Sequence, residues 1–190
     1  MTTVSEQNLS KFLDLFEKWN RSINLSAATT REELDEHVRD SLEVVPLLAR
    51  CARVLDVGSG GGFPVVVAAI CLPHVTFTSL EPIHKKHAFL RTVARELSLA
   101  NLDPRAERIE DHAVHDYDAA MSRATFDLVE WLTLGRRYVS PGGFVVGFEA
   151  TPRTDLPPGS VRHPYSLGDK SRALVVFHVE HNGARTAGSD

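Results

Sequence analysis

A short apolar run followed by a cluster of glycines constrains this chain more than any other feature. The run covers residues 53–57, Arg-Val-Leu-Asp-Val, and residues 58–62, Gly-Ser-Gly-Gly-Gly, follow it directly. Such a run is typical of a buried parallel strand, and glycines let the backbone turn sharply and approach a ligand closely. The pattern predicts a strand, a ligand-binding turn and then a helix that has Pro64 in its first turn.

The rest of the chain alternates strand-like and helix-like segments. Strands are predicted at 53–57, 75–81, 117–122, 143–149 and 173–180, with a weaker one near 102–106, and helices at 63–71, 84–98 and 126–138. This alternation predicts an α/β fold with a mostly parallel central sheet and helices on both faces. The polar, proline-rich segment 151–159 is followed by two strand-like runs without a helix between them, which favours a C-terminal antiparallel hairpin.

Two amphipathic helices are predicted before the first strand. Apolar side chains recur at helical spacing from Leu9 to Trp19 and again from Leu34 to Val45, and a polar segment separates the two stretches. We therefore expect a small N-terminal helical extension over residues 1–50 and a main domain over 51–181. The polar tail over 182–190 is expected to be disordered.

Composition narrows the class of protein. The 190 residues fit one domain with a short extension, and the formal net charge of -4 argues against a general nucleic-acid binder but leaves room for a local basic groove. No apolar run approaches the ~20 residues of a membrane helix, and the N-terminus lacks a signal pattern. Cys51 and Cys71 lie in or beside apolar stretches, as core thiols do in a reducing compartment. We expect a cytoplasmic protein that makes no membrane contact.

An acid at the end of the second predicted strand points to a nucleoside cofactor. Glu81 follows Gly58 by roughly the 20 residues at which a carboxylate binds ribose hydroxyls in such folds. A dinucleotide-binding loop needs glycine or alanine where this chain has Phe63, and no P-loop pattern occurs. The order Asp-x-Gly-x-Gly-x-Gly from Asp56 to Gly62 resembles motif I of class I methyltransferases. That resemblance implies S-adenosylmethionine, with NAD as the remaining alternative.

Further segments resemble one family within that class. They are residues 19–26, 37–42, 81–90, 105–107 and 122–124, taken together with Asp-Val-Gly-Ser-Gly-Gly-Gly-Phe-Pro at 56–64. From about residue 9 to 145 the chain resembles the RsmG (GidB) family of bacterial small-subunit rRNA methyltransferases. The resemblance implies a Rossmann-like class I methyltransferase fold and methyl transfer to N7 of a guanine in 16S rRNA. It also implies 16S rRNA or the small ribosomal subunit as the partner, and we expect a monomer.

Candidate site residues follow from the resemblance and from the ends of the predicted strands. Asn24, Asp40 and Arg123 are expected at the guanine pocket, with turn formation or capping as the alternative for the first two and a surface salt bridge for Arg123. His37 either joins them or is a buried structural histidine. The expected cofactor-binding residues are Asp56, Gly58, Ser59, Gly60, Gly62, Phe63, Glu81, Ala106, Glu107 and Arg123.

The chain departs from the family pattern at two places. Val65 stands where the family has glycine, which is tolerable if a helix has begun there. Residues 147–150, Gly-Phe-Glu-Ala, stand where the family has a Lys-Gly pair after the fifth strand. A carboxylate near RNA phosphate is repelled, so Glu149→Lys is expected to tighten RNA binding. The missing lysine keeps two alternatives open, a small-molecule methyltransferase and a cofactor-binding module with weakened catalysis.

Three His-x-x-His pairs raise the question of a metal. They are His84 with His87, His112 with His115, and His178 with His181. Zinc sites of this spacing also need cysteines or a third spaced ligand, and neither accompanies the pairs. No metal is therefore predicted.

Overall fold

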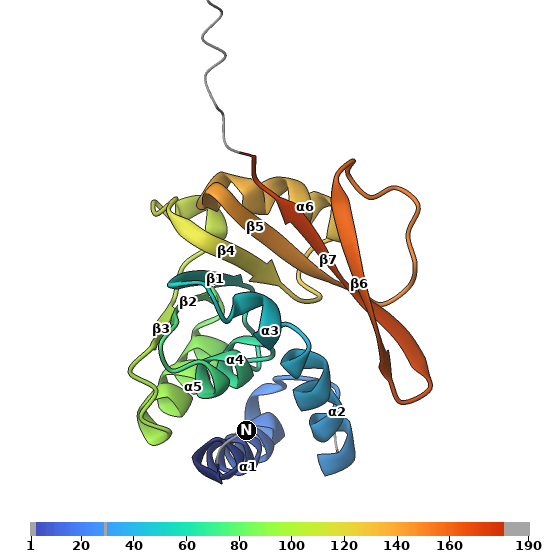
Figure 1. Ribbon diagram of the computed structural model, residues 1–190. Helices are drawn as coiled ribbons and strands as arrows, with labels where there is room; N and C mark the ends of the chain where they lie inside the picture. Colours follow the sequence, from blue (N-terminus) through green and yellow to red (C-terminus); the bar gives the residue numbers. More distant parts are fainter. Residues whose placement is uncertain (1–2, 29, 181–190) are drawn as a thin grey trace, which may run out of the picture.

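A seven-stranded sheet organises the computed structural model, which describes residues 3–28 and 30–180 (Figure 1). The strands are β1 (Arg53–Val57), β2 (Thr76–Leu80), β3 (Leu102–Arg105), β4 (Tyr117–Ser122), β5 (Val139–Glu149), β6 (Ser160–Leu167) and β7 (Lys170–His178). Their order is β3-β2-β1-β4-β5-β7-β6. The first five strands run parallel, whereas β7 pairs antiparallel with both β5 and β6. The predicted C-terminal antiparallel hairpin is confirmed.

Helices cover both faces of this sheet. They are α1 (Thr3–Ile23), α2 (Arg31–Leu42), α3 (Val45–Leu48), α4 (Val65–Cys71), α5 (His84–Glu96) and α6 (Leu128–Gly135). The α1, α4 and α5 helices lie on one side of the sheet and α6 lies on the other (Figure 1). Each side has its own apolar cluster, one around Phe12, Phe89 and Val66 and the other around Trp131 and Leu55. Since both faces are covered, β1 is buried along almost its whole length.

The N-terminal helices pack directly on the glycine loop. A Cβ atom added at Gly61 would lie 2.5 Å from the Phe16 ring, so only glycine allows α1 to approach this closely. Phe12 and Phe16 also surround the ring of Phe63, with ring centroids 5.1 and 5.4 Å away. The predicted extension therefore shares the core of the main fold and helps to shape the loop that is expected to bind the cofactor.

Most predicted elements form at their expected places, and the differences have local causes. The strands β1 and β4 have the predicted bounds, but β5 begins at Val139 rather than residue 143 because Ser-Pro-Gly-Gly stays extended through a register shift. The α6 helix starts at Leu128 because the Asp127 carboxylate accepts hydrogen bonds from the first-turn amides. Pro64 precedes α4 instead of lying in its first turn, and Val65 opens that helix.

Two other predictions concern the ends of the chain and its relation to membranes. The predicted tail at 182–190 lies outside the described residues. Within 3–28 and 30–180, no helix combines the length and the hydropathy needed to cross a membrane.

Candidate functional site

The strand order reverses between β1 and β4, and the candidate site lies where this reversal occurs. In open α/β sheets, ligands bind beyond the carboxyl ends of the strands at such a point. The glycine loop follows β1, Glu81 follows β2 and Arg123 follows β4, so all three reach the same edge of the sheet. The hydroxyl of Thr125 donates to the Gly58 carbonyl at 3.2 Å and ties two of these loops together.

Glu81 holds the glycine loop in place. Its Oε2 atom accepts a hydrogen bond from the Gly60 amide at 2.8 Å, and its Oε1 atom accepts one from the Ile83 amide at 2.9 Å. Gly60 has a φ of 52°, and a Cβ there would meet only the Gly58 carbonyl oxygen at 3.8 Å. The carboxylate of Glu81 thus lies beside a backbone turn with open space above it.

Asp56 brings a buried acceptor without a partner to this turn. The residue is 1% exposed, and no described group hydrogen-bonds its Oδ2 atom. Burial raises the pKa of its carboxyl group to about 7. A buried acceptor without a donor is costly, so the position suits a ligand that brings N–H or O–H groups. S-adenosylmethionine carries an ammonium group and two ribose hydroxyls, and the residues around this turn therefore fit it.

The remaining predicted cofactor residues divide between the surface and the interior. Ser59 is buried, accepts a hydrogen bond from the Ser79 hydroxyl at 2.7 Å and donates its amide to Leu80, which is a structural arrangement. Gly62 packs against α4 and α1, because an added Cβ would meet Val66 at 2.6 Å. Ala106 is exposed just after β3, and the Glu107 carboxylate bonds to His112 Nδ1.

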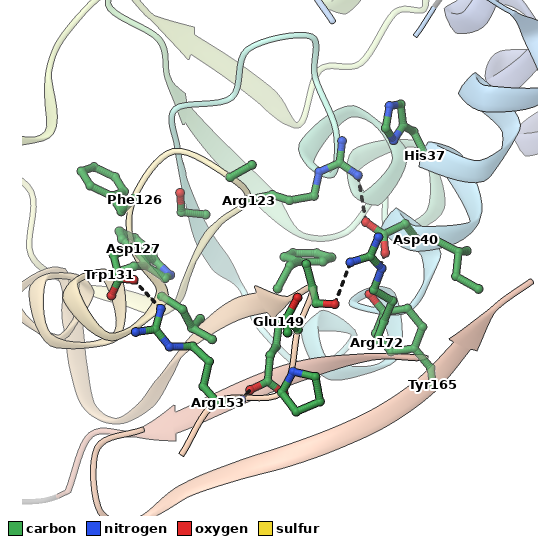
Figure 2. A pocket seen from close by; sticks show the side chains of 18 of the residues that line it. His37, Asp40, Arg123, Phe126, Asp127, Trp131, Glu149, Arg153, Tyr165 and Arg172 are labelled. Carbon is green, nitrogen blue, oxygen red and sulfur yellow. Dashed lines mark hydrogen bonds and ion pairs between the residues drawn. The ribbon is translucent and has the colours of Figure 1, made fainter. Parts of the chain in front are cut away.

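A cavity of about 630 Å³ adjoins the glycine loop on the side of β4 and β5 (Figure 2). It is lined by His37 and Asp40 from α2, by Arg123 after β4, by Glu149 at the end of β5, and by Tyr165 and Arg172 from the hairpin. Residues 58–63 do not line it. The cavity therefore has room for a substrate group next to, rather than inside, the proposed cofactor turn.

Asp40 and Arg123, predicted separately, form an ion pair in this cavity. Arg123 Nη1 donates to Asp40 Oδ2 at 2.9 Å, and both side chains are mostly buried. The Arg123 guanidinium also lies 5.5 Å from the centre of the Phe63 ring, in cation–π range. Tyr165 completes the group, since its hydroxyl donates to Asp40 Oδ1 at 2.6 Å. Burial and the neighbouring carboxylate both raise the pKa of Tyr165, which keeps its proton.

Asn24 and His37 lie differently from one another. Asn24 is exposed with a φ of 54° and is not among the residues that line the cavity. Its turn is held by Asn20, whose side chain bonds the backbone of residues 25, 26 and 28. His37 lines the cavity with its ring 5.3 Å from that of Phe63. Burial and then the charge of Arg123 lower the pKa of His37, so the ring is neutral near pH 7.

Glu149 requires a correction. Its carboxylate was expected to face RNA, but the side chain is only 4% exposed and receives two hydrogen bonds from the Arg162 guanidinium, at 2.7 and 2.9 Å. The Arg153 amide donates a third. Burial opposes ionisation, but these bonds outweigh it and lower the pKa of Glu149. The charge is neutralised within the protein, so the acid at this position is not evidence against an RNA substrate.

His87, His112 and His115, which belong to two of the predicted histidine pairs, take part in hydrogen bonds within the fold. His112 is buried and its Nε2 atom lies 2.9 Å from the Tyr117 hydroxyl, while its Nδ1 atom contacts Glu107. His87 Nε2 lies 3.2 Å from the Pro104 carbonyl oxygen. In the part of the chain that the structure describes, no three histidine, cysteine, aspartate or glutamate residues are arranged to hold a metal.

Two solved structures share this fold. A methyltransferase from Geobacter sulfurreducens matches with a TM-score of 0.65 at 12% identity, over 90% of this chain and 89% of its own. The apo form of the S-adenosylmethionine-dependent methyltransferase SibL matches with a TM-score of 0.62 at 22% identity, over 78% of this chain and 55% of its own. The fold, the glycine turn and the acid after β2 that binds this turn are those of a class I S-adenosylmethionine-dependent methyltransferase.

Sequence comparison then gives the family. The family described as "GidB: rRNA small subunit methyltransferase G" matches residues 5–155. A protein of Myxococcus xanthus named ribosomal RNA small subunit methyltransferase G is 38% identical over 152 residues, 77% of this chain and 70% of the relative. One of the same name from Burkholderia vietnamiensis is 37% identical over 95% of this chain and 86% of the relative. The chain belongs to the GidB family.

Proposed function

We propose that this protein transfers a methyl group from S-adenosylmethionine to N7 of a guanine in 16S rRNA. Family membership supports the rRNA substrate. The observation that carries the proposal is the juxtaposition of a cofactor turn, marked by Asp56 and Glu81, with a separate cavity that contains the Asp40–Arg123 pair. A turn for the methyl donor and a neighbouring space for a base are what such a transfer needs.

The chain's own residues hold the cofactor and position the base. Asp56, Glu81 and the backbone from Gly58 to Gly60 hold the methyl donor, which supplies an electrophilic methyl group when bound. Guanine N7 has a lone pair and no proton, so its attack requires alignment rather than a general base. Asp40 offers its remaining lone pairs to the base as positive charge develops, and Arg123 fixes Asp40 while its flat guanidinium faces Phe63.

The remaining parts of the proposal concern where the protein works. The small ribosomal subunit or its rRNA is the macromolecular partner, and the protein acts in the cytoplasm as a monomer without a metal. We place Asn24 at the rim of the proposed site, because the next residue, Leu25, packs beside Gly61 at the edge of the glycine loop.

The decisive experiment is mass-spectrometric measurement of 7-methylguanosine in small-subunit rRNA. Cells that lack this protein should lose one such nucleoside, and the purified protein with S-adenosylmethionine should restore it on their small subunits. An Arg123→Ala variant should restore it much more slowly while binding S-adenosylhomocysteine normally. Unchanged 7-methylguanosine in the deletion strain would contradict the proposed target. Transfer of label to small molecules but not to subunits would favour a small-molecule methyltransferase.

A further inference from the structure

The acidic side chains of the cavity are neutralised by cations of the protein itself. Each of the four is in an ion pair, and the pairs are Asp40 with Arg123, Glu149 with Arg162, Asp127 with Arg153, and Glu36 with Lys170. The two pairs of Asp127 and Glu36 are partly exposed and contribute little to stability, but all four pairs reduce the local negative field. Although the protein has a net negative charge, an anionic substrate is therefore not strongly repelled from this cavity.

Arg172 differs from the two other arginines that line the cavity. Arg123 and Arg153 are both in ion pairs, whereas Arg172 Nη1 donates to the backbone carbonyl of Ala150 at 2.9 Å. Across residues 3–28 and 30–180, no carboxylate lies within ion-pair distance of Arg172. A guanidinium group carries five N–H donors, so this single bond fixes the side chain and leaves donors for a ligand. Figure 2 shows Arg172 in the cavity between Asp40 and Glu149.

Strand pairing in the C-terminal hairpin places Arg172 next to the other residues of the site. Arg172 on β7 lies directly opposite Tyr165 on β6, and directly opposed residues project from the same face of a sheet. Tyr165 binds Asp40, which in turn binds Arg123. The charge of Arg172 is thus placed beside Ala150, directly after the end of β5.

We propose that Arg172 binds a phosphate group of the RNA strand that carries the target base, an inference that rests on the proposed function. The forked guanidinium matches phosphate oxygens in geometry and in charge. The carboxylate of the cofactor is the other anion near this site, but residues 58–63 of the cofactor turn do not line the cavity. Arg172 lies on the hairpin side of the Asp40–Arg123 pair, opposite Tyr165.

The test is a salt titration of binding to small subunits that lack the methyl group, by filter binding. Arg172→Gln keeps a hydrogen bond donor for Ala150 and removes the charge, so the affinity at low salt should fall several-fold. The slope of log K against log salt should fall by about one, as expected for one lost phosphate contact. Arg172→Lys should keep the slope but not the full affinity. Arg50→Gln removes the same charge from an exposed residue before β1 and should match the wild type.

Each outcome bears on the proposal. Wild-type slope in Arg172→Gln, or equal slopes in the Lys and Gln variants, would overturn it. Calorimetry with S-adenosylhomocysteine should give wild-type affinity for both variants. A loss there with an unchanged RNA slope would assign the anion to the cofactor and also overturn it. Failure of the wild type itself to bind or methylate small subunits would instead refute the proposed function.

Discussion

Burial raises the pKa of the Asp56 carboxyl group to about 7, and this has opposite consequences for stability and for binding. Its pKa in the folded protein, about 7, lies above the ordinary value of 3.8. The folded state therefore keeps a proton that the unfolded chain releases as the pH rises from about 4 to about 7. Within that window, Asp56 weakens the fold as the pH increases, and it reaches its full destabilising effect above pH 7.

Asp56→Asn should stabilise the ligand-free protein and weaken cofactor binding. At pH 8 we expect a gain on the order of 2 kcal/mol, because an amide is not penalised by burial as an anion is. Affinity for S-adenosylhomocysteine should fall at least tenfold. Denaturant unfolding at pH 8 and pH 4 measures the first effect, which should nearly disappear at pH 4. Calorimetry measures the second, and unchanged affinity would remove Asp56 from the cofactor site.

Glu149→Lys provides a test of the corrected role of that residue. A lysine at this buried position would face Arg162 and leave the Arg153 amide without its acceptor. We expect a loss of about 2 kcal/mol, toward the low end for a buried pair because Arg162 is partly exposed. Thermal unfolding checks this, with Glu110→Lys as a charge-matched change at an exposed residue that should cost little. Tighter RNA binding without loss of stability would restore the expectation drawn from the sequence.

At the scale of elements, α1 packs against the proposed cofactor turn although it precedes the sheet. Phe12 is fully buried and packs against the glycine loop. Its ring atom Cζ would lie 3.4 Å from a Cβ atom added at Gly62. The loop is also held by Glu81 and by hydrogen bonds from its amides to the Leu80 carbonyl oxygen. Packing from α1 adds to these contacts, and we expect it to help keep the turn in a shape that binds the cofactor.

Phe12→Leu should weaken S-adenosylhomocysteine binding more than its effect on stability explains. The substitution should cost about 1–2 kcal/mol of unfolding free energy, since a smaller side chain leaves a gap in the core. Leu132→Val makes a gap of similar cost on the opposite face of the sheet. Calorimetry at a temperature where both variants are folded should show a several-fold loss of affinity only for Phe12→Leu. Equal affinities would separate α1 from the site.

The elements were more predictable from the sequence than the contacts between them. A strand such as β4 is a local pattern, so its bounds followed from residues 117–122 alone. Tyr165 was missed because its partner Asp40 lies 125 residues away, and no local pattern reports such a contact. The charge of Glu149 was expected to face RNA, and this was wrong for the same reason. Its carboxylate is neutralised by Arg162, which lies 13 residues further along the chain. The turn from Asp56 to Gly62 was predictable because ligand chemistry limits its sequence.

At the scale of the whole molecule, three distant parts of the chain line the cavity that we propose for the substrate. The α2 helix supplies Asp40, the segment after β4 supplies Arg123, and the C-terminal hairpin supplies Tyr165 and Arg172. The match to the family model ends at residue 155, before the hairpin strands β6 and β7, although the relative from Burkholderia vietnamiensis matches 95% of this chain.

The charges of this assembled cavity predict how the reaction depends on pH. Burial and Arg123 lower the pKa of His37, so the ring is mostly neutral at neutral pH and above, and burial and Asp40 raise the pKa of Tyr165, so its hydroxyl keeps its proton up to about pH 9. The pKa of Glu149 is lowered, which keeps that group ionised in the same range. With no proton to remove from N7, no step needs a base that titrates near neutrality.

The rate of methyl transfer should accordingly be almost flat across that range. The measurement is a single-turnover experiment at saturating cofactor and small subunit, with 7-methylguanosine quantified by mass spectrometry. Saturating cofactor matters, because the ionisation of Asp56 near pH 7 would otherwise make binding pH-dependent. His37→Gln should leave the profile flat, since a neutral ring already stands there. A tenfold rise in rate from pH 6.5 to 9 would mean that the accepting atom loses a proton, as an exocyclic amine or a hydroxyl does, and N7 would not be the target.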